Sequence, residues 1–161
     1  MEQEQLKSIL DILRMMKELE LTAAEFYRTC GEIWIIEKDF WINMGQSELK
    51  HAQNIDLMIK IFSEKPEKFE LGHPFKRPAI QTFISGVKLD IQRLRSRKLS
   101  KGKTLFVARD IEQSILESKY MEIIRTNEPE FQTLMKQILL DTVTHKEWLN
   151  EKMKQSNPGS P

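Results

Sequence analysis

Five side chains that can bind a metal ion interrupt apolar stretches of this 161-residue sequence. They are three glutamates and two histidines: Glu20, Glu48, His51, Glu112 and His145. Each lies at helical spacing from apolar residues of its own segment, which predicts a position on a buried helix face. Burying an unpaired carboxylate costs several kcal/mol, so these residues need a partner. A divalent cation would be suitable, because it neutralises carboxylates and also binds imidazole nitrogen.

The spacing within this set favours two ions rather than one. Glu48 and His51 are three positions apart, so both side chains lie on one helix face and can hold the same ion. A related pattern recurs in the second half of the chain. Glu20 and Glu112 are 92 positions apart, and His51 and His145 are 94 apart. This approximate repeat predicts a pair of metal ions on a common axis.

The elements that must position these residues are helices. Apolar residues recur at spacings of three and four in four long segments, residues 3–33, 39–63, 104–126 and 129–155. Asp39 is expected to cap the second helix. Proline and glycine mark a connection over residues 64–77, and a shorter helix is predicted at 78–97. The sequence thus predicts one all-α domain over residues 1–155, built from two antiparallel helical hairpins with an extra helix in the crossover, and a disordered tail at 156–161.

Composition excludes several classes of protein. The formal net charge is +1 with acidic and basic residues interspersed, so we expect no nucleic-acid partner. Cys30 is the single cysteine, which leaves no intrachain disulfide and no Cys-x-x-Cys metal motif. No apolar run approaches the roughly 20 residues that span a membrane, and the first residues do not resemble a signal peptide. We therefore expect a cytoplasmic protein.

Two segments resemble the ferritin-like superfamily, and in particular the rubrerythrin-type di-iron carboxylate proteins. Residues 20–27 are similar to that family's first helix, in which a ligand glutamate precedes a Phe-Tyr pair, here Phe26 and Tyr27. Residues 41–51 resemble its second helix, in which an aromatic residue and a small residue precede Glu-x-x-His. The resemblance covers roughly residues 6–63 and 104–153 and is closer in the first half.

This resemblance implies a ferritin-like four-helix bundle that binds iron, with two ions expected and with one ion, or another divalent metal, as the alternative. It implies reduction of peroxide or dioxygen, or iron handling, with a small-molecule oxidant and an external electron-donor protein. It also implies a homodimer, for which the apolar residues 34–36 are available. Glu20 or Glu112 is expected to bridge the two ions, with one histidine on each.

The second half departs from the family pattern. Thr142 stands where a second Glu-x-x-His motif would carry glutamate. Asp141 is either a substitute ligand or a hydrogen-bond partner of the His145 imidazole. Glu117 competes with Glu112 as the ligand of its helix, and Lys119 is expected to share the face of Glu112.

These departures leave two alternatives to a di-iron oxidoreductase. One is a degenerate ferritin-like bundle with a partial site, or none, that serves in binding or sensing. The other is an unrelated helical adaptor, in which the five residues would not converge. The side chains of Tyr27, Trp41, Met44 and Phe62 are expected to be core residues in either case, and Cys30 an inert small hydrophobe.

Overall fold

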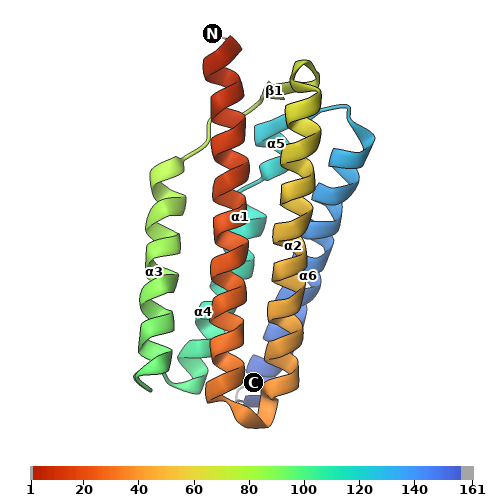
Figure 1. Cartoon of the computed structure of the whole chain (residues 1–161). Helices are drawn as coiled ribbons and strands as arrows, with labels where there is room; N and C mark the ends of the chain where they lie inside the picture. Colours follow the sequence, from red (N-terminus) through yellow and green to blue (C-terminus); the bar gives the residue numbers. More distant parts are fainter. Residues whose placement is uncertain (1, 157–161) are drawn as a thin grey trace.

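The computed structural model describes residues 2–156, and most of them are helical (Figure 1). The helices are α1 (Glu2–Ile33), α2 (Lys38–Glu64), α3 (Arg77–Arg95), α4 (Lys101–Glu117), α5 (Tyr120–Ile123) and α6 (Pro129–Ser156). The other elements of this part of the chain are two 3-10 turns, η1 (Ile35–Glu37) and η2 (Pro66–Lys68), and two short strands, β1 (Phe69–Leu71) and β2 (Ile124–Thr126). The predicted helical class is confirmed, and the arrangement is compatible with a helical bundle.

Four helices surround the interior in two pairs. α1 packs against α2 as a hairpin closed by η1, and α4 packs against α6. α2 also contacts α6, and the two run in opposite directions (Figure 1). α3 lies against the outer side of α1 and carries the chain back along the length of the molecule to the start of α4 (Figure 1). It is the extra helix expected in the connection.

The predicted helix over residues 104–126 is wrong beyond residue 117. α4 ends there, and Lys119 adopts a left-handed backbone conformation with a φ of 50°, which breaks the helix. The chain then forms α5 and β2, which pairs antiparallel with β1, so that Ile124 lies opposite Leu71. The prediction extended too far because Ile123 continues the helical spacing of apolar residues. Spacing within one segment carries no information about pairing with a distant strand.

Three smaller expectations also differ from the structure. α2 begins at Lys38 after η1, and no side chain caps its start, so Asp39 is not the cap. α3 ends at Arg95, two residues earlier than expected, and Arg97 has a φ of 55°. Ser156, assigned to the disordered tail, is the last residue of α6, and residues 157–161 lie outside the described part of the chain.

Large apolar side chains fill the space between the helices. The expected core residues Tyr27, Trp41, Met44, Phe62 and Cys30 are all buried. The close packing of α1 and α2 depends on Gly45, because a Cβ atom there would meet the carbonyl oxygen of Ala24 at 3.3 Å. This close approach occurs three residues before Glu48 and brings its helix tightly against α1.

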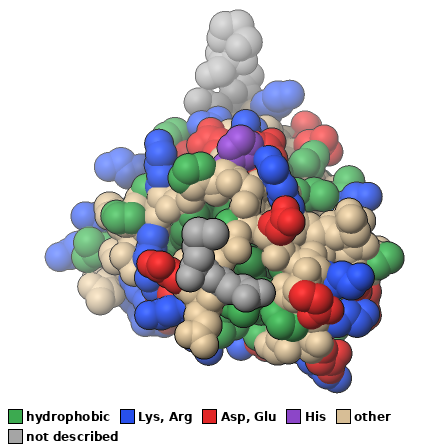
Figure 2. Space-filling model, turned by 90° about the horizontal axis from the view of Figure 1, so that it is seen from above, with side chains coloured by type: hydrophobic (Ala, Val, Ile, Leu, Met, Phe, Trp, Pro, Cys, Tyr) green, Lys and Arg blue, Asp and Glu red, His purple; other side chains and the backbone are tan. Residues whose placement is uncertain are grey.

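The surface has no single dominant charge on the end of the molecule shown in Figure 2, where acidic and basic side chains lie interspersed. That distribution agrees with the formal net charge of +1. Within residues 2–156, no helix combines the length and the apolar character needed to cross a membrane.

Candidate metal centre

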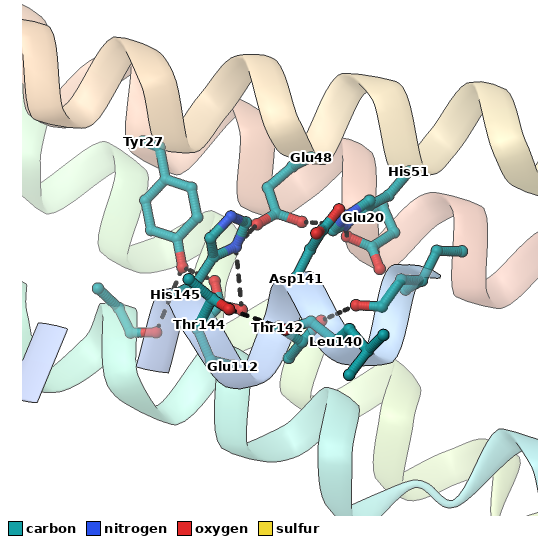
Figure 3. A network of polar contacts seen from close by, with 12 residues as sticks. Glu20, Tyr27, Glu48, His51, Glu112, Leu140, Asp141, Thr142, Thr144 and His145 are labelled. Atoms are coloured by element: carbon teal, nitrogen blue, oxygen red, sulfur yellow. Dashed lines mark hydrogen bonds and ion pairs between the residues drawn. The ribbon is translucent and has the colours of Figure 1, made fainter. Parts of the chain in front are cut away.

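The five predicted side chains meet in the interior, although they come from four helices (Figure 3). α1 supplies Glu20, α2 supplies Glu48 and His51, α4 supplies Glu112, and α6 supplies His145. All five are buried, with between 0 and 3% of the side chain exposed. They form two groups, Glu20–Glu48–His51 and Glu48–Glu112–His145, and within each group the potential ligand atoms lie within 4.8 Å of one another.

Glu48 belongs to both groups and lies between the two imidazole rings (Figure 3). Its Oε2 atom lies 3.0 Å from Nδ1 of His51, and its Oε1 atom lies 2.8 Å from Nδ1 of His145. The outer carboxylates are placed symmetrically. Oε2 of Glu20 lies 3.5 Å from Nδ1 of His51, and Oε2 of Glu112 lies 3.5 Å from Nδ1 of His145. Glu48 is therefore the carboxylate common to both groups, whereas the sequence led us to expect Glu20 or Glu112 as the bridge between two ions.

Several polar atoms of the cluster have no hydrogen-bond partner within the described part of the chain. They are Oε2 of Glu20, Oε1 of Glu48, Oε2 of Glu112 and Nδ1 of His145. Oε1 of Glu48 and Nδ1 of His145 are close to each other, but they are not aligned as a hydrogen bond. Leaving a buried polar group unsatisfied costs about 1–3 kcal/mol, and more for a charged group. Oxygen and nitrogen atoms of this kind, all in one buried cluster, fit a bound metal ion.

The carboxyl groups of the cluster perturb one another strongly. Burial raises the pKa of Glu20 well above its usual range, and the neighbouring charge of Glu48 raises it further. The same two causes, in the same order, raise the pKa of Glu112 to about 7. Burial also opposes ionisation of Glu48, but its close contacts with Glu20 and with both imidazoles outweigh burial and hold its pKa below the usual range.

Both imidazoles are poised as cations when no metal is bound. Burial lowers the pKa of each ring, but the nearby carboxylates more than compensate. The close contacts with Glu20 and Glu48 raise the pKa of His51 to about 11. The contacts with Glu112 and Glu48 raise the pKa of His145 to about 10. In the metal-free protein the protons on the two imidazoles thus offset part of the carboxylate charge, and a metal ion that binds these nitrogens would have to displace protons.

Asp141 joins the cluster from α6, but at a different histidine from the one expected. Its Oδ2 atom lies 3.0 Å from Nε2 of His51, and its Oδ1 atom accepts a hydrogen bond of 2.9 Å from Gln137. The expected partner was His145, four residues later on the same helix. The contact instead crosses from α6 to α2, because the inward face of α6 places Asp141 beside the neighbouring helix (Figure 3).

Thr142 is fully buried at the position where a second ligand glutamate was expected. Its hydroxyl group donates a hydrogen bond of 2.7 Å to the carbonyl oxygen of Ile138, one turn earlier. The hydroxyl is therefore satisfied by the backbone of its own helix. The cluster is left with three buried glutamates rather than four.

Tyr27 is the cluster contact that sequence reasoning missed. Its hydroxyl donates a hydrogen bond of 2.5 Å to Oε1 of Glu112, and it also lies 3.3 Å from the carbonyl oxygen of Ala108. The signal was available, since Tyr27 follows Glu20 by seven residues and so shares its helix face. A buried tyrosine hydroxyl usually has a hydrogen-bond partner, so a core position does not exclude a role at the site.

Two residues considered for the site lie outside it. Glu117 is exposed and accepts a hydrogen bond of 2.6 Å from Gln113. Lys119 is also exposed, so it does not share the inward face of Glu112. Glu117 lies five residues after Glu112 within α4, which turns it off the inward face, and Lys119 lies beyond the end of the helix. No inward lysine therefore replaces metal charge within the cluster.

Comparison with models of protein families, with curated proteins and with solved structures gave no match. Fold and site therefore define only a class, a helical protein whose buried glutamates and histidines can hold metal ions.

Proposed function

We propose that this chain has a ferritin-like fold and binds two iron ions. One ion would be held by Glu20, Glu48 and His51, the other by Glu48, Glu112 and His145. The observation that carries this proposal is the set of buried, unpartnered oxygen and nitrogen atoms at the centre of the cluster. Without a cation, burying those unpartnered atoms destabilises the fold, and apolar side chains at the same positions would pack without that cost.

The ligand types favour iron over other common ions. Carboxylate oxygens suit hard ions such as magnesium, calcium and manganese, whereas imidazole suits zinc, copper, iron and nickel. A set that combines both, with no thiolate, is typical of di-iron carboxylate proteins. Charge also balances, because three glutamates and Asp141 carry as many negative charges as two divalent ions carry positive ones. Such balance matters in a buried site, where net charge is expensive.

The resemblance noted in the sequence extends the proposal to redox chemistry. An iron pair would supply two electrons to peroxide, which with two protons gives two molecules of water, or would react with dioxygen. Tyr27 donates a hydrogen bond to Oε1 of Glu112, and with a metal ion at Nδ1 of His51 the Nε2–H group of that ring would donate a hydrogen bond to Asp141. Met44 and Ile55, one turn from the ligands of α2, are fully buried and keep water away. An external electron-donor protein would return the electrons.

Self-association is a further part of this proposal. Ile35 and Ile36, at the tip of the first hairpin, are 71% and 101% exposed. Apolar side chains of this size at a protruding turn support a homodimer. Light scattering at micromolar concentration would measure the mass of the wild type and of Ile36→Lys. We expect a dimer that the substitution dissociates, and a wild type with the mass of a monomer would contradict this part of the proposal.

A second candidate function keeps the bundle without the redox reaction. The observation that favours it is Thr142, because its hydroxyl is used by the backbone and the cluster lacks a fourth buried carboxylate. Such a protein would sense or store a metal, or bind a partner, without turnover. Metal binding with no peroxide-dependent oxidation of the iron would support this alternative.

The deciding experiment is elemental analysis of protein loaded anaerobically with ferrous iron and then desalted. We expect about two iron ions per chain in the wild type. Glu48→Gln should lose both, since Glu48 is shared, whereas the exposed Glu117→Gln should retain both. Absence of iron from the wild type, or equal iron in the two variants, would overturn the proposal.

A further inference from the structure

The two metal-binding groups are not equivalent, and the difference begins in the sequence repeat. At the offset of 94 positions that relates His51 to His145, Glu48 corresponds to Thr142, and Ser47 corresponds to Asp141. The first half thus carries Ser-Glu before its histidine motif, and the second half carries Asp-Thr. The carboxylate has moved by one position, which turns it toward a different part of the cluster.

That shift gives His51 a carboxylate on both sides of its ring. Nδ1 of His51 lies 3.0 Å from Glu48 and 3.5 Å from Glu20, and Nε2 lies 3.0 Å from Asp141. A carboxylate that accepts the outer N–H of a metal-binding imidazole fixes the ring and makes its other nitrogen a stronger ligand. Asp141 is itself held by Gln137, so this support is oriented in advance.

His145 has no such support. Within residues 2–156, its only carboxylate contacts are those of Nδ1 with Glu48 and Glu112, and no carboxylate lies behind Nε2. Its ring stacks on that of His51 and lies beside the half-exposed indole of Trp148, with ring centroids 5.9 Å and 5.6 Å away. Neither ring is an anionic acceptor that would strengthen His145 as a ligand in the way Asp141 strengthens His51.

The outer carboxylate of the second group is also the weaker ligand. Glu112 already accepts the hydrogen bond from Tyr27 at Oε1, which withdraws negative charge from the carboxylate whose other oxygen, Oε2, would bind metal. Among the described residues, no tyrosine hydroxyl donates a hydrogen bond to Glu20 in the first group. The other tyrosine, Tyr120, has a buried hydroxyl without a hydrogen-bond partner. Three carboxylates therefore surround His51, and two surround His145.

We propose that the two sites fill in order. The Glu20–Glu48–His51 site, with Asp141 as its positioning residue, binds the first metal ion. The Glu48–Glu112–His145 site binds the second ion more weakly, so at limiting metal the chain holds one ion beside His51. This inference rests on the proposed function and adds the order of loading.

The test is a titration of metal-free protein with cobalt(II). Binding is measured by calorimetry and by the visible absorption of the bound ion. We expect two steps whose dissociation constants differ by about tenfold or more. His145→Ala should keep the tight step and lose the weak one, and His51→Ala should lose the tight step. These two variants are matched, because each removes one buried imidazole.

Asp141 is tested separately. Asp141→Asn should weaken the tight step about 10- to 100-fold and change its absorption spectrum, while the weak step stays the same. Asp141→Glu should restore part of the affinity, which a merely structural role would not predict. Ser47→Asp should place a carboxylate near His145 and strengthen the weak step.

Three results would overturn the proposed order while leaving two-metal binding intact. They are two steps of equal affinity, a tight step that survives His51→Ala but not His145→Ala, and a tight step unchanged in Asp141→Asn. Wild-type protein that binds no metal would overturn the proposed function, and with it this inference.

Discussion

The Oε1 atom of Glu48 lies 2.8 Å from Nδ1 of His145, a residue 97 positions later in the chain. The other oxygen of the same carboxylate faces His51, so one side chain of α2 joins the two halves of the cluster. Loss of metal, of protons or of hydrogen bonds from one half of the cluster should therefore affect the other half as well.

Removal of metal should lower thermal stability. A ligand that binds only the folded state stabilises it by about 2.7 kcal/mol when its concentration is 100 times the dissociation constant. For a chain of this length, that corresponds to a fall of roughly 5–10 °C in Tm on adding a chelator. Differential scanning calorimetry of metal-loaded protein with and without chelator would measure the shift. Glu48→Gln should show none, and an equal shift in that variant would place the bound metal elsewhere.

The metal-free protein should become less stable as pH rises from about 4.5 to about 10. The pKa values of His51 and His145 are raised to about 11 and about 10 by their carboxylate partners, so above the ordinary value of 6.5 the folded state binds more protons than the unfolded chain. Their contribution is complete below pH 6.5 and is lost as pH rises through the folded values. Glu112, raised to about 7 by burial and by Glu48, acts in the same direction between pH 4.5 and 7.

Urea unfolding at several pH values, in the presence of chelator, would measure this dependence. His145→Gln should reduce this dependence above pH 6.5 and leave the part that His51 contributes. Metal affinity should change in the opposite direction and rise with pH, because the ion displaces protons from both imidazoles. A metal-free protein whose stability increases between pH 7 and 9 would contradict the ion pairs of the cluster.

Tyr27→Phe should destabilise the metal-free protein by about 1–3 kcal/mol, because it leaves Oε1 of Glu112 buried without its donor. Tyr120→Phe is the matched control. Its hydroxyl is also buried, but it has no hydrogen-bond partner among the described residues, so its removal should cost little or should stabilise. Denaturant unfolding of both variants gives the comparison. A larger loss for Tyr120→Phe would mean that the Tyr27 hydrogen bond contributes little.

Thr142→Glu should have effects of opposite sign in the two states of the protein. Without metal, a fourth carboxylate in a fully buried position adds uncompensated charge, so Tm should fall. With metal, the new Glu-x-x-His pair with His145 should strengthen the second site, so the stabilisation by metal should grow. The measurement is Tm with and without added metal, compared with Thr142→Val, which adds no charge. A variant that gains no metal affinity would show that position 142 does not face the ions.

The sequence by itself determined the helical class and the residues of the site. Apolar spacing located the long helices, and the acidic and histidine residues on their inward faces, Glu20, Glu48, His51, Glu112 and His145, all lie in the cluster. This was possible because helical periodicity can be read from residues close together in the chain. Burying a charged side chain is also costly, so a charged residue on an apolar helix face indicates a site that stabilises it.

The tertiary structure alone decided how those residues are connected. It showed that Glu48 is shared, that Asp141 supports His51 across two helices, that Tyr27 donates to Glu112, and that α4 ends before Lys119. Each of these contacts joins positions far apart in the chain, or depends on a strand pairing between distant segments. Spacing within one helix fixes which face a side chain occupies, but only the packing of helices against each other fixes which atom it meets.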